Sequence, residues 1–345
     1  MAIGPSRAPA MTDVARLAGV SHQTVSRVLN DHPNVKQQTR LRVLAAMQEL
    51  GYRPNRAARA LASGRSDQIG VVAQPSTLFG PASLLYAVEA AAVQAGYGVS
   101  VASVAALDRA SIEEAVNRHL DQQVGGIIVI VPVVSAAAAI REVPADQPLV
   151  TIGGDRNEAI TSVGIDQVRG ATQATQALLE AGHRTVWHVS GPVDVFDSLD
   201  RIDGWRATLE QAGAEVPPVI TSDWSAAGGY EAGKMLARIP DVTAIFAAND
   251  QTALGILRAL HEHGLRVPED VSLIGFDDLP ESEFFIPPLT TVRQAFQEVG
   301  QRALRMLVTQ MEGQREVLHE LVPPVFIRRE SVAPPRDRRD TGVPA

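Results

Sequence analysis

The sequence predicts a small all-α head with a helix-turn-helix, followed by an α/β body of two lobes, each built on a doubly wound parallel sheet. Three observations predict this class. Short amphipathic segments separated by glycines fill the first fifty residues, apolar runs alternate with helical stretches from residue 69 onward, and that alternation occurs twice in succession.

The charge of the chain is divided unevenly between these two parts. The 345 residues carry a net charge of −8. Residues 1–65 hold 10 of the 31 basic and 3 of the 39 acidic residues, a net charge of +7, which leaves −15 for residues 66–345. A basic head on an acidic body favours a nucleic acid as the partner of the head. On charge alone, a solvated basic surface is the alternative.

Composition excludes several classes of protein. Hydrophobic residues make up 45% of the chain, enough for sizeable cores in two or three domains, which excludes a disordered or collagen-like chain. The absence of cysteine excludes cysteine nucleophiles and thiolate metal sites, and it fits a reducing compartment. No apolar run reaches the ~18 residues of a membrane span, and residues 1–10 lack the apolar stretch of a secretory signal.

Three short helices are expected in the head, over residues 11–18, 22–29 and 37–50. Thr12 is expected to cap the first helix and Ser21 the second, while Gly19 and Gly51 end the first and the third. Two helices joined by a short turn that contains glycine form a helix-turn-helix. Helical spacing predicts these inner faces: Val14, Leu17 and Ala18; Val25, Val28 and Leu29; Leu41, Leu44, Ala45 and Met47 or Gln48.

Residues 55–65 have the pattern of a linker. Asn55 can cap a short helix over residues 56–62, which Gly64 would end. A helix of this length is not stable alone in water, so its order should depend on what it contacts.

The body shows continuous apolar runs between helices, which is typical of parallel sheets covered on both faces. Two such series in tandem predict two similar lobes with a cleft between them. Strands are expected at 69–73, 98–101, 126–131, 149–152, 163–165, 185–190, 244–247, 271–275, 318–322 and 325–327. Helices are expected at 83–95, 111–120, 135–140, 167–181, 198–212, 226–239, 251–263 and 295–311.

Ligands of such sheets bind beyond the carboxyl ends of the strands. The polar residues that follow strands are therefore site candidates: Asp155, residues 191–197, Asn249-Asp250 and Asp277-Asp278. For Asp250 and Asp278, a helix cap is the alternative.

Motifs of common enzyme classes are missing. The first strands are not followed by Gly-x-Gly-x-x-Gly or a Walker sequence, and the chain has no Gly-x-Ser-x-Gly turn. His261-Glu-His263 resembles a metal site, but residues i and i+2 of a helix point to different faces, which favours a solvated helix end. We therefore expect no enzyme activity, metal or cofactor.

Several motifs together resemble the LacI/GalR family of repressors. The head motifs are Asp13-Val-Ala-Arg-Leu-Ala-Gly-Val-Ser21, Gln23-Thr-Val-Ser-Arg-Val-Leu-Asn30, Gly51-Tyr-Arg-Pro-Asn55 and Ala60-Leu61. The body motifs are Ala181-Gly-His183, Gly204-Trp205, Ala248-Asn-Asp250, Ala253-Leu-Gly255, Gly275-Phe-Asp-Asp278 and Pro288-Leu-Thr-Thr291. The resemblance covers residues 11 to about 330 and implies a body like that of the periplasmic binding proteins.

The resemblance also implies domain boundaries. They are a DNA-binding head at 11–54, a hinge helix or linker at 55–65, a sugar-binding and dimerisation body at 66–330 and a flexible tail at 332–345. Within the body, the N-lobe comprises 66–165 and 295–323, and the C-lobe comprises 166–293 and 324–331.

In this family the second helix of the head reads bases in the major groove. The matching base-reading residues are His22, Gln23 and Arg27; solvation of the helix is the alternative for His22 and Gln23. Arginine can bond guanine through O6 and N7, and glutamine can bond adenine through N6 and N7. The expected phosphate contacts are Ser21, Thr24, Ser26, Asn30 and Thr39.

The linker is where the family inserts a leucine into the minor groove, which kinks the DNA. The matching hinge residues are Asn55, Ala58 and Leu61; packing of Leu61 on the body is the alternative. Two such helices from a homodimer imply a pseudo-palindromic operator of double-stranded DNA. One family member that the chain resembles ends in a leucine-heptad helix that makes it a tetramer, whereas residues 331–345 have three prolines and no apolar heptad, so a dimer is expected.

The resemblance places a small sugar or glycoside in the cleft as effector. Sugar sites need forked hydrogen bonds to adjacent hydroxyls and an apolar surface for the ring. The matching residues are Arg201, Asn249 and Asp277 as polar ligands, Trp224 and Phe296 as stacking surfaces, Asp197 as an added acceptor, Gln294 at the crossing, and Leu78, Phe79, Pro81 and Leu84 along one wall.

Three positions depart from that family member. Ile130, Gly153 and Ile165 stand where it has Asn, Asp and Phe, so two polar contacts are lost and one aromatic wall is thinned. The sugar should therefore differ from a simple galactoside, and the space near Gly153 favours a larger glycoside.

The resemblance predicts a repressor of sugar-utilisation genes that works in the cytoplasm at the nucleoid and releases its operator when sugar binds. A corepressor-dependent regulator of the same family is the first alternative. A sugar-binding protein without DNA activity is the second, and the basic head argues against it.

Overall fold

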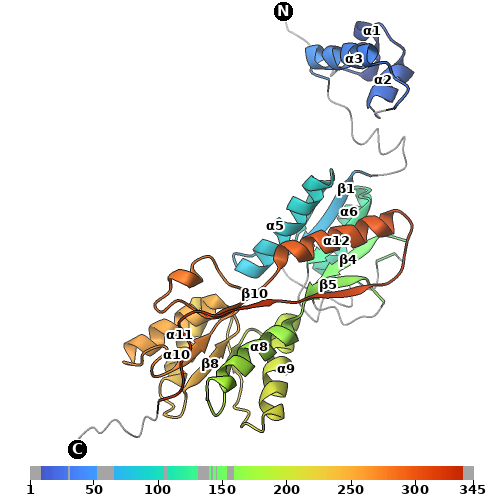
Figure 1. Ribbon diagram of the computed structural model, residues 1–345. Helices are drawn as coiled ribbons and strands as arrows, with labels where there is room; N and C mark the ends of the chain where they lie inside the picture. Colours follow the sequence, from blue (N-terminus) through green and yellow to red (C-terminus); the bar gives the residue numbers. More distant parts are fainter. Residues whose placement is uncertain are drawn as a thin grey trace, which may run out of the picture. The chain divides into compact units, whose positions relative to one another are not determined.

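The computed structural model describes residues 9–29, 32–52, 66–104, 108–130, 140, 143–144, 146–153 and 159–336. The chain divides into two compact units, Met1–Asp67 and Gln68–Ala345, here called the head and the body (Figure 1). No helix in the described part of the chain is long and apolar enough to cross a membrane.

The head consists of α1 (Met11–Ala18), α2 (His22–Leu29) and α3 (Gln37–Leu50). Val14, Val25 and Val43, one from each helix, are fully buried and form the centre of its core. As predicted, Gly19 and Gly51 end α1 and α3 in the left-handed conformation, with φ of 63° and 61°.

Two details of the head differ from the sequence predictions. Thr12 does not cap α1, because the cap position is Ala10, whose amide donates to the Asp13 carboxylate at 2.9 Å. The predicted buried faces of the helices are also partly wrong. Each of the three short helices buries only the side that faces the other two. Three leucines expected in the core are therefore exposed: Leu17 at 46%, Leu41 at 61% and Leu44 at 47%.

The body contains two sheets in which all strands are parallel. The N-lobe sheet has the order β11-β5-β4-β3-β1-β2 and the C-lobe sheet the order β7-β6-β8-β9. The N-lobe strands are β1 (Gln68–Ala73), β2 (Gly98–Ser103), β3 (Gly126–Ile130), β4 (Leu149–Ile152), β5 (Ser162–Ile165) and β11 (His319–Val322). The C-lobe strands are β6 (Trp187–Ser190), β7 (Ile220–Thr221), β8 (Ala244–Ala247) and β9 (Ser272–Ile274).

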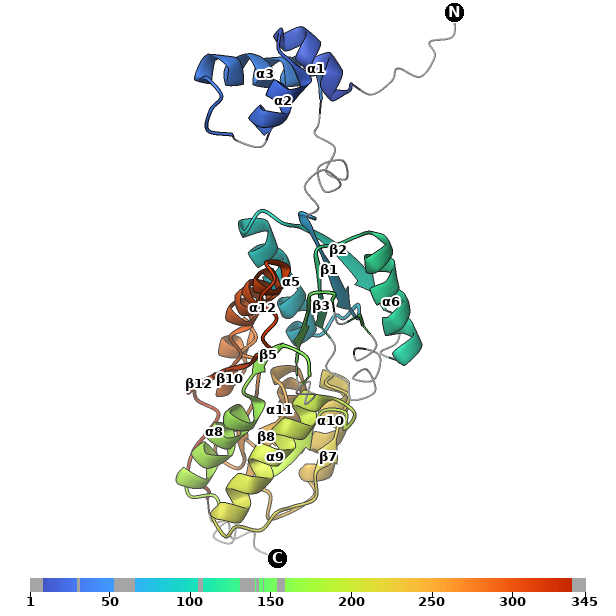
Figure 2. The same ribbon diagram turned by 90° about the vertical axis from the view of Figure 1, so that its right-hand side faces the viewer.

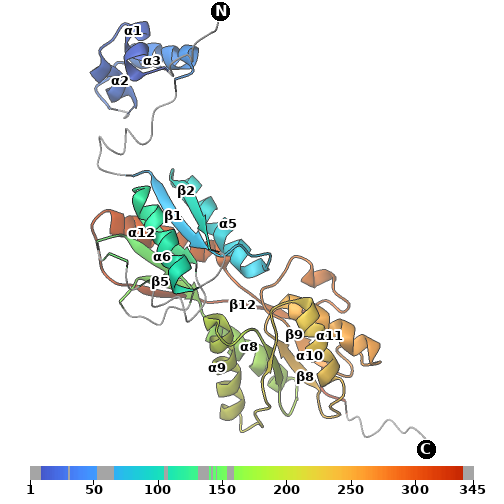
Figure 3. The same ribbon diagram turned by 180° about the vertical axis from the view of Figure 1, so that it is seen from behind.

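Helices cover both faces of each sheet. In the N-lobe, α5 (Phe79–Gln94) and α12 (Phe296–Met311) pack on one face and α6 (Arg109–Asp121) on the other (Figure 2). In the C-lobe, α8 (Gln167–Glu180) and α9 (Phe196–Gln211) lie opposite α10 (Ala226–Leu236) and α11 (Asp250–Glu262) (Figure 3). Each sheet is therefore buried between two apolar layers, which explains its continuous apolar strands.

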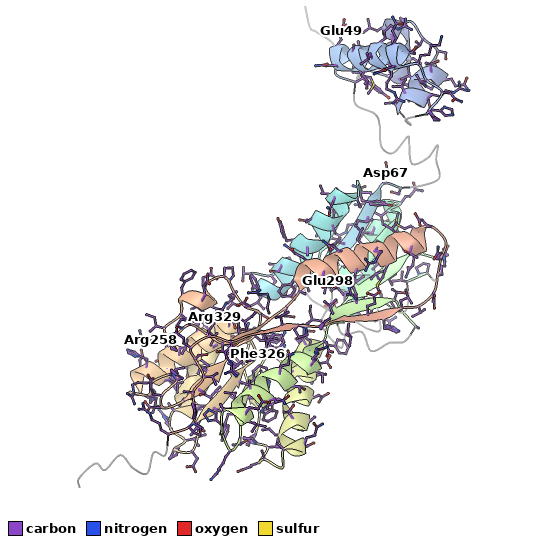
Figure 4. All side chains as sticks on the ribbon, in the orientation of Figure 1. Glu49, Asp67, Arg258, Glu298, Phe326 and Arg329 are labelled. Atoms are coloured by element: carbon purple, nitrogen blue, oxygen red, sulfur yellow. The ribbon has the colours of Figure 1, made fainter. Side chains whose placement is uncertain are left out.

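The chain passes between the lobes after β5, after β10 (Thr291–Arg293) and after β11. β10 pairs antiparallel with β12 (Val325–Ile327), and a short 3₁₀ helix, η2 (Ser282–Phe284), lies between β9 and β10. Phe326 on β12 and Arg329 beyond it belong to the last segment of the chain, which lies on the C-lobe (Figure 4). The sequence patterns missed β7, β10 and η2, each of only two or three residues.

The expected flexible tail, 332–345, is anchored at its start. The Ala333 amide donates to Ser272 Oγ at 3.0 Å, and its carbonyl oxygen lies 3.0 Å from His183 Nε2. Ser331 is buried and hydrogen-bonds the carbonyl oxygen of Leu273 at 2.6 Å. The tail therefore begins later than expected, and residues 337–345 lie outside the described residues.

Gly255 permits the close approach of α10 and α11. A Cβ at this position would overlap the Ala226 carbonyl oxygen and the Tyr230 amide nitrogen. We expect Gly255→Ala to lower the free energy of unfolding by about 1–3 kcal/mol, the usual cost of overpacking. Denaturant unfolding measures this cost. The neighbouring Leu254→Ala, at a 44% exposed position, is the control, and an equal loss in the two variants would contradict the packing argument.

Candidate functional site

The solvent face of α2 carries the three residues predicted to read bases. His22, Gln23 and Arg27 are all exposed, whereas Val25 and Val28 of the same helix are buried in the head core. Gln23 and Arg27 are four residues apart and therefore share one face of the helix. The head thus presents a polar helix face that its own packing does not use.

The described residues among the predicted phosphate contacts lie on α2, directly before it and in the first turn of α3. Ser21 Oγ accepts a hydrogen bond from the Thr24 amide at 3.1 Å and contacts the Thr24 hydroxyl at 2.9 Å, so Ser21 caps α2 as predicted. Ser26 and Thr39 are half-buried, on α2 and in the first turn of α3. Asn30 and the hinge residues Asn55, Ala58 and Leu61 lie outside the described residues.

A second candidate site is a cavity of about 590 Å³ in the body, lined by residues of both lobes. Ten of the eleven residues predicted to bind an effector line it: Leu78, Pro81, Leu84, Asp197, Arg201, Trp224, Asn249, Asp277, Gln294 and Phe296. Phe79 does not line this cavity. Its ring packs edge-on against that of Phe296, with centroids 5.9 Å apart.

The cavity lies at the carboxyl ends of parallel strands. In the N-lobe, the segment after β1 and the ends of β3 and β4 form the wall, and in the C-lobe the segments after β6, β8 and β9 contribute. Three polar lining residues from the same ends were not among the sequence candidates, namely Gln74 and Ser76 after β1 and Asp108 after β2, whereas the lining residue Asp194 belongs to the predicted stretch 191–197. Their position after strands was the available signal, because that edge of a parallel sheet holds the ligand site.

Two of the three departures from the family pattern line the cavity. Ile130 and Gly153 form part of the N-lobe wall. Ile165 does not line it, because its side chain packs in the N-lobe core with Val163 and Val322. The substitution at Ile165 therefore does not thin the wall of the cavity, contrary to the expectation.

Arg201 is the most enclosed charged group of the cavity, with 2% of its surface exposed. Its Nε donates to Gln167 Oε1 at 3.0 Å, and its Nη1 donates to the Ala248 carbonyl oxygen. The guanidinium carbon lies 3.9 Å from the centroid of the Phe276 ring and 5.2 Å from that of Trp224. These contacts fix the plane of the Arg201 guanidinium group, here called the arginine fork, without a ligand.

The remaining nitrogen of Arg201 lies between two carboxylates. Nη2 is 4.0 Å from Asp197 Oδ2 and 4.0 Å from Asp277 Oδ1. Both distances exceed the 2.7–3.2 Å of an ordinary hydrogen bond. A ligand hydroxyl placed between these groups can accept from the guanidinium and donate to a carboxylate, which is the chemistry that a sugar offers.

Glutamines connect the arginine to the aspartate. Gln167 Nε2 donates to Gln294 Oε1 at 2.9 Å, and Gln294 Nε2 donates to Asp277 Oδ1 at 2.5 Å. Gln167 is buried and was not among the predicted site residues. Its partners are far away in sequence, so no local pattern indicated this position.

Asn249 holds the cavity wall in addition to lining it. Its Oδ1 accepts from the Thr252 amide at 2.8 Å, which caps α11, and its Nδ2 donates to the Trp224 carbonyl oxygen at 3.1 Å. Trp224 and Asp277 both have positive φ, 70° and 103°, an uncommon conformation for such residues that is found often at ligand sites. An added Cβ on Gly191 would overlap the Trp224 indole, so this glycine lets the ring lie against the backbone.

The helix-cap alternative is wrong for Asp250, because Asn249 caps α11, and for Asp278, because its carboxylate bonds two arginines and Glu281 is the cap position of η2. The buried Asp250 carboxylate accepts hydrogen bonds from the hydroxyls of Ser282 and Thr291 at 2.6 Å each. Asp278 accepts from Arg293 Nε at 2.6 Å and from Arg329 Nη2 at 2.7 Å. Both aspartates therefore brace the segments on either side of β10 instead of binding ligand.

No group of three metal-ligating side chains occurs among the described residues. In the His261-Glu-His263 motif, Glu262 accepts hydrogen bonds from Tyr230 and Arg258, and His263 Nδ1 lies 2.8 Å from the Ala259 carbonyl oxygen. These contacts belong to a helix end.

Burial dominates the electrostatics of the cavity. It raises the pKa of Asp277 to about 7, although the Arg201 charge opposes the shift. Burial also raises the pKa of Asp197, again against Arg201, and it lowers the pKa of Arg201 itself, against Asp277 and Asp197. The three charges therefore stabilise one another in a site where each alone would be costly.

The raised pKa of Asp277 predicts a pH-dependent stability difference. The Asp277 carboxyl keeps its proton up to about pH 7 in the folded protein, whereas an ordinary aspartate loses it near pH 3.8. Protonation of Asp277 therefore stabilises the folded state fully below about pH 4, and this stabilisation is lost as the pH rises to 7. Relative to wild type, Asp277→Asn should gain up to about 1.4 kcal/mol of unfolding free energy per pH unit over this range.

The measurement is denaturant unfolding of both proteins at pH 5, 6, 7 and 8. Buried His188, with a pKa lowered to about 4, changes stability in the opposite direction, but it is common to both proteins and cancels in the difference. If the difference in unfolding free energy between the two proteins stayed constant with pH, it would contradict the raised pKa of Asp277.

Comparison with known proteins gives matches over both parts of the chain. Residues 10–55 match the family described as "Bacterial regulatory proteins, lacI family", and residues 175–332 match the "Periplasmic binding protein-like domain". The chain is 34% identical to the lactose operon repressor of Escherichia coli (strain K12) over 327 residues, which cover 94% of this chain and 90% of that protein. It is 36% identical over 325 residues to the HTH-type transcriptional regulator CelR of Thermobifida fusca, covering 89% and 93%.

Solved structures show the same architecture. The crystal structure of the lac repressor dimer bound to operator and the anti-inducer ONPF matches with a TM-score of 0.86 at 33% identity, covering 95% of this chain and 100% of that one. The complex of the transcriptional regulator CelR with cellobiose matches with a TM-score of 0.70 at 33% identity, covering 94% and 99%.

Proposed function

Because the chain belongs to the lacI family of bacterial regulatory proteins, we propose that it is a transcriptional repressor that binds operator DNA as a homodimer and releases it when a sugar enters the cleft of the body. One observation carries the proposal. The same chain combines an exposed polar face on α2 with a cleft whose fixed arginine fork lies between two carboxylates.

In this proposal the head reads the operator. Arg27 and Gln23 bond base edges in the major groove, and His22 adds a contact whose base preference is specific to this chain. Ser21, Thr24, Ser26, Asn30 and Thr39 contact phosphates and fix the register. The basic charge of residues 1–65 supports this role, because phosphate contacts supply much of the affinity for DNA.

The linker and the dimer complete the DNA-binding unit. Asn55, Ala58 and Leu61 of each protomer form a hinge over the centre of a pseudo-palindromic operator, with Leu61 inserted into the minor groove. The crystal structure of a relative, the lac repressor dimer bound to operator, supports the binding of DNA as a dimer. The proposed boundaries are 11–54 for the head, 55–65 for the hinge and 66–330 for the body.

The cleft is the effector site. Arg201, Asp197 and Asp277 bond the hydroxyls of one sugar ring, and Trp224 and Phe296 cover its apolar faces. Sugar binding favours a different relative placement of the lobes, and this change separates the hinge helices. We propose no catalytic role, since the relatives are named as regulators.

A gel-shift assay tests the DNA-binding part of the proposal. The full chain is mixed with fragments of the source genome at low salt, with an excess of unrelated DNA as competitor. We expect a small set of fragments to be retained, and these should share a pseudo-palindrome. Absence of DNA binding at low salt would overturn the repressor function and favour a sugar-binding protein without DNA activity.

The sign of the response is tested on a retained fragment. Release by a sugar supports induction. Stronger retention with every sugar that binds would contradict induction and identify a corepressor-dependent regulator of the same family.

A further inference from the structure

The wall of the effector cleft is strongly acidic. Among the described residues that line it are four carboxylates, Asp108, Asp194, Asp197 and Asp277, and one cation, Arg201. Arg201 already lies between two of the carboxylates, at 4.0 Å from each. The lining therefore repels a negative charge.

The groups that attract anions in other proteins are occupied in this cleft. Helix N-termini and arginine forks are the usual anion sites. Asp108 caps α6 and accepts from the Ser111 amide at 2.8 Å, Asn249 caps α11, and Asp197 lies in the first turn of α9. Two nitrogens of Arg201 already donate to Gln167 and to the Ala248 carbonyl oxygen.

The acidic residues lie at two depths. Asp277 is 7% exposed and belongs to the closed end of the cleft with Arg201. Asp108 and Asp194, from the N-lobe and the C-lobe, are exposed and therefore lie at the mouth. The mouth thus presents one carboxylate from each wall, and each can accept hydrogen bonds from a ligand, since the Ser111 amide bonds only Oδ1 of Asp108.

The cleft also has room for more than one sugar ring. Its volume is about 590 Å³, and a water molecule in the liquid occupies about 30 Å³, so about twenty water-sized atoms fit. A hexose has about 12 non-hydrogen atoms and leaves part of this volume open, and the roughly 23 of a disaccharide fit because covalently bonded atoms lie closer together than water molecules do. One ring at the closed end therefore leaves the mouth open for a second.

We propose that the cleft selects an uncharged sugar of two rings and excludes phosphorylated and acidic sugars, with Asp108 and Asp194 accepting hydrogen bonds from the hydroxyls of the outer ring. This inference rests on the sugar-sensing function proposed above. It names the chemical class of the effector and the residues that distinguish it.

Isothermal titration calorimetry with the full chain tests the class. The probes are cellobiose, lactose and maltose, the monosaccharides glucose and galactose, and the charged sugars glucose 6-phosphate, cellobionate and lactobionate. We expect one of the neutral disaccharides to bind at least tenfold more tightly than the monosaccharides and than every charged probe. A charged probe or a monosaccharide that binds as tightly as the best disaccharide overturns the inference and leaves the sugar-sensing function intact. No binding by any probe counts against both.

Variants at the mouth test the residue assignment. Asp194→Asn should weaken the disaccharide roughly tenfold, the loss expected for a hydrogen bond to a charged group, without changing the affinity for the monosaccharide. Asp194→Lys should bring the affinity for cellobionate or lactobionate closer to the affinity for the corresponding neutral disaccharide. The control is Glu210→Lys, an exposed carboxylate of α9 outside the cleft, which should leave all affinities unchanged. If the Asp194 and Glu210 variants changed the sugar affinities equally, the assignment of Asp194 to the outer ring would be overturned.

Discussion

Replacing Arg201 by lysine is expected to raise the dissociation constant of the sugar at least tenfold. Lysine keeps a positive charge between Asp197 and Asp277, but it lacks the planar guanidinium whose Nε and Nη1 are held by Gln167 and Ala248 while Nη2 faces the ligand. Hydrogen bonds to charged groups contribute about 1.5–3 kcal/mol each, so the loss of one of them accounts for this change. Calorimetric titration of the sugar measures it.

The same substitution should reduce the response of the operator complex to sugar. The complex of Arg201→Lys should persist at sugar concentrations that release the unsubstituted protein. Arg206→Lys is the matched control, because Arg206 lies on the same helix, α9, with an exposed side chain that does not line the cleft. A normal sugar affinity in Arg201→Lys would contradict the central role given to the fork.

Replacing Arg27 by alanine is expected to weaken specific operator binding about 10- to 100-fold. A bidentate contact between arginine and guanine is worth about 1–3 kcal/mol of discrimination between bases. The affinity for unrelated DNA should fall much less, because it depends on phosphate contacts and total charge. Fluorescence anisotropy with operator and unrelated duplexes at one salt concentration measures both.

Arg16→Ala is the control for this second prediction. Arg16 lies on α1, its side chain is 80% exposed, and its removal changes the charge of the head by the same amount. It should lower the affinity for both duplexes equally. If Arg16→Ala and Arg27→Ala gave the same loss of specificity, α2 would not be the helix that reads the operator.

The layered architecture of the body was readable from the sequence, because parallel strands buried on both faces require continuous apolar runs. The runs at residues 69–73, 149–152 and 244–247 are strands of the two sheets. The position of the cleft followed from the same pattern, since polar residues after strands gather at one edge of each sheet. Asp197 and Asp277 were found in this way.

Features that depend on distant partners were not readable. Leu41 and Leu44 have helical spacing, but periodicity does not tell which face of α3 has a neighbour. Gln167 bonds both Arg201, 34 residues away in sequence, and Gln294, 127 residues away, and no local pattern indicates such contacts. Asn249 caps α11 in place of Asp250 because Ser282 and Thr291 bind the Asp250 carboxylate.

The central claim is that one chain couples operator binding by the head to sugar binding in the cleft. The most direct test is the affinity of the full chain for its selected operator, measured by fluorescence anisotropy with and without a saturating disaccharide. A coupling free energy of about 1–3 kcal/mol predicts that sugar weakens the operator complex about 5- to 150-fold. An operator affinity that no cleft-binding sugar changes would contradict the account.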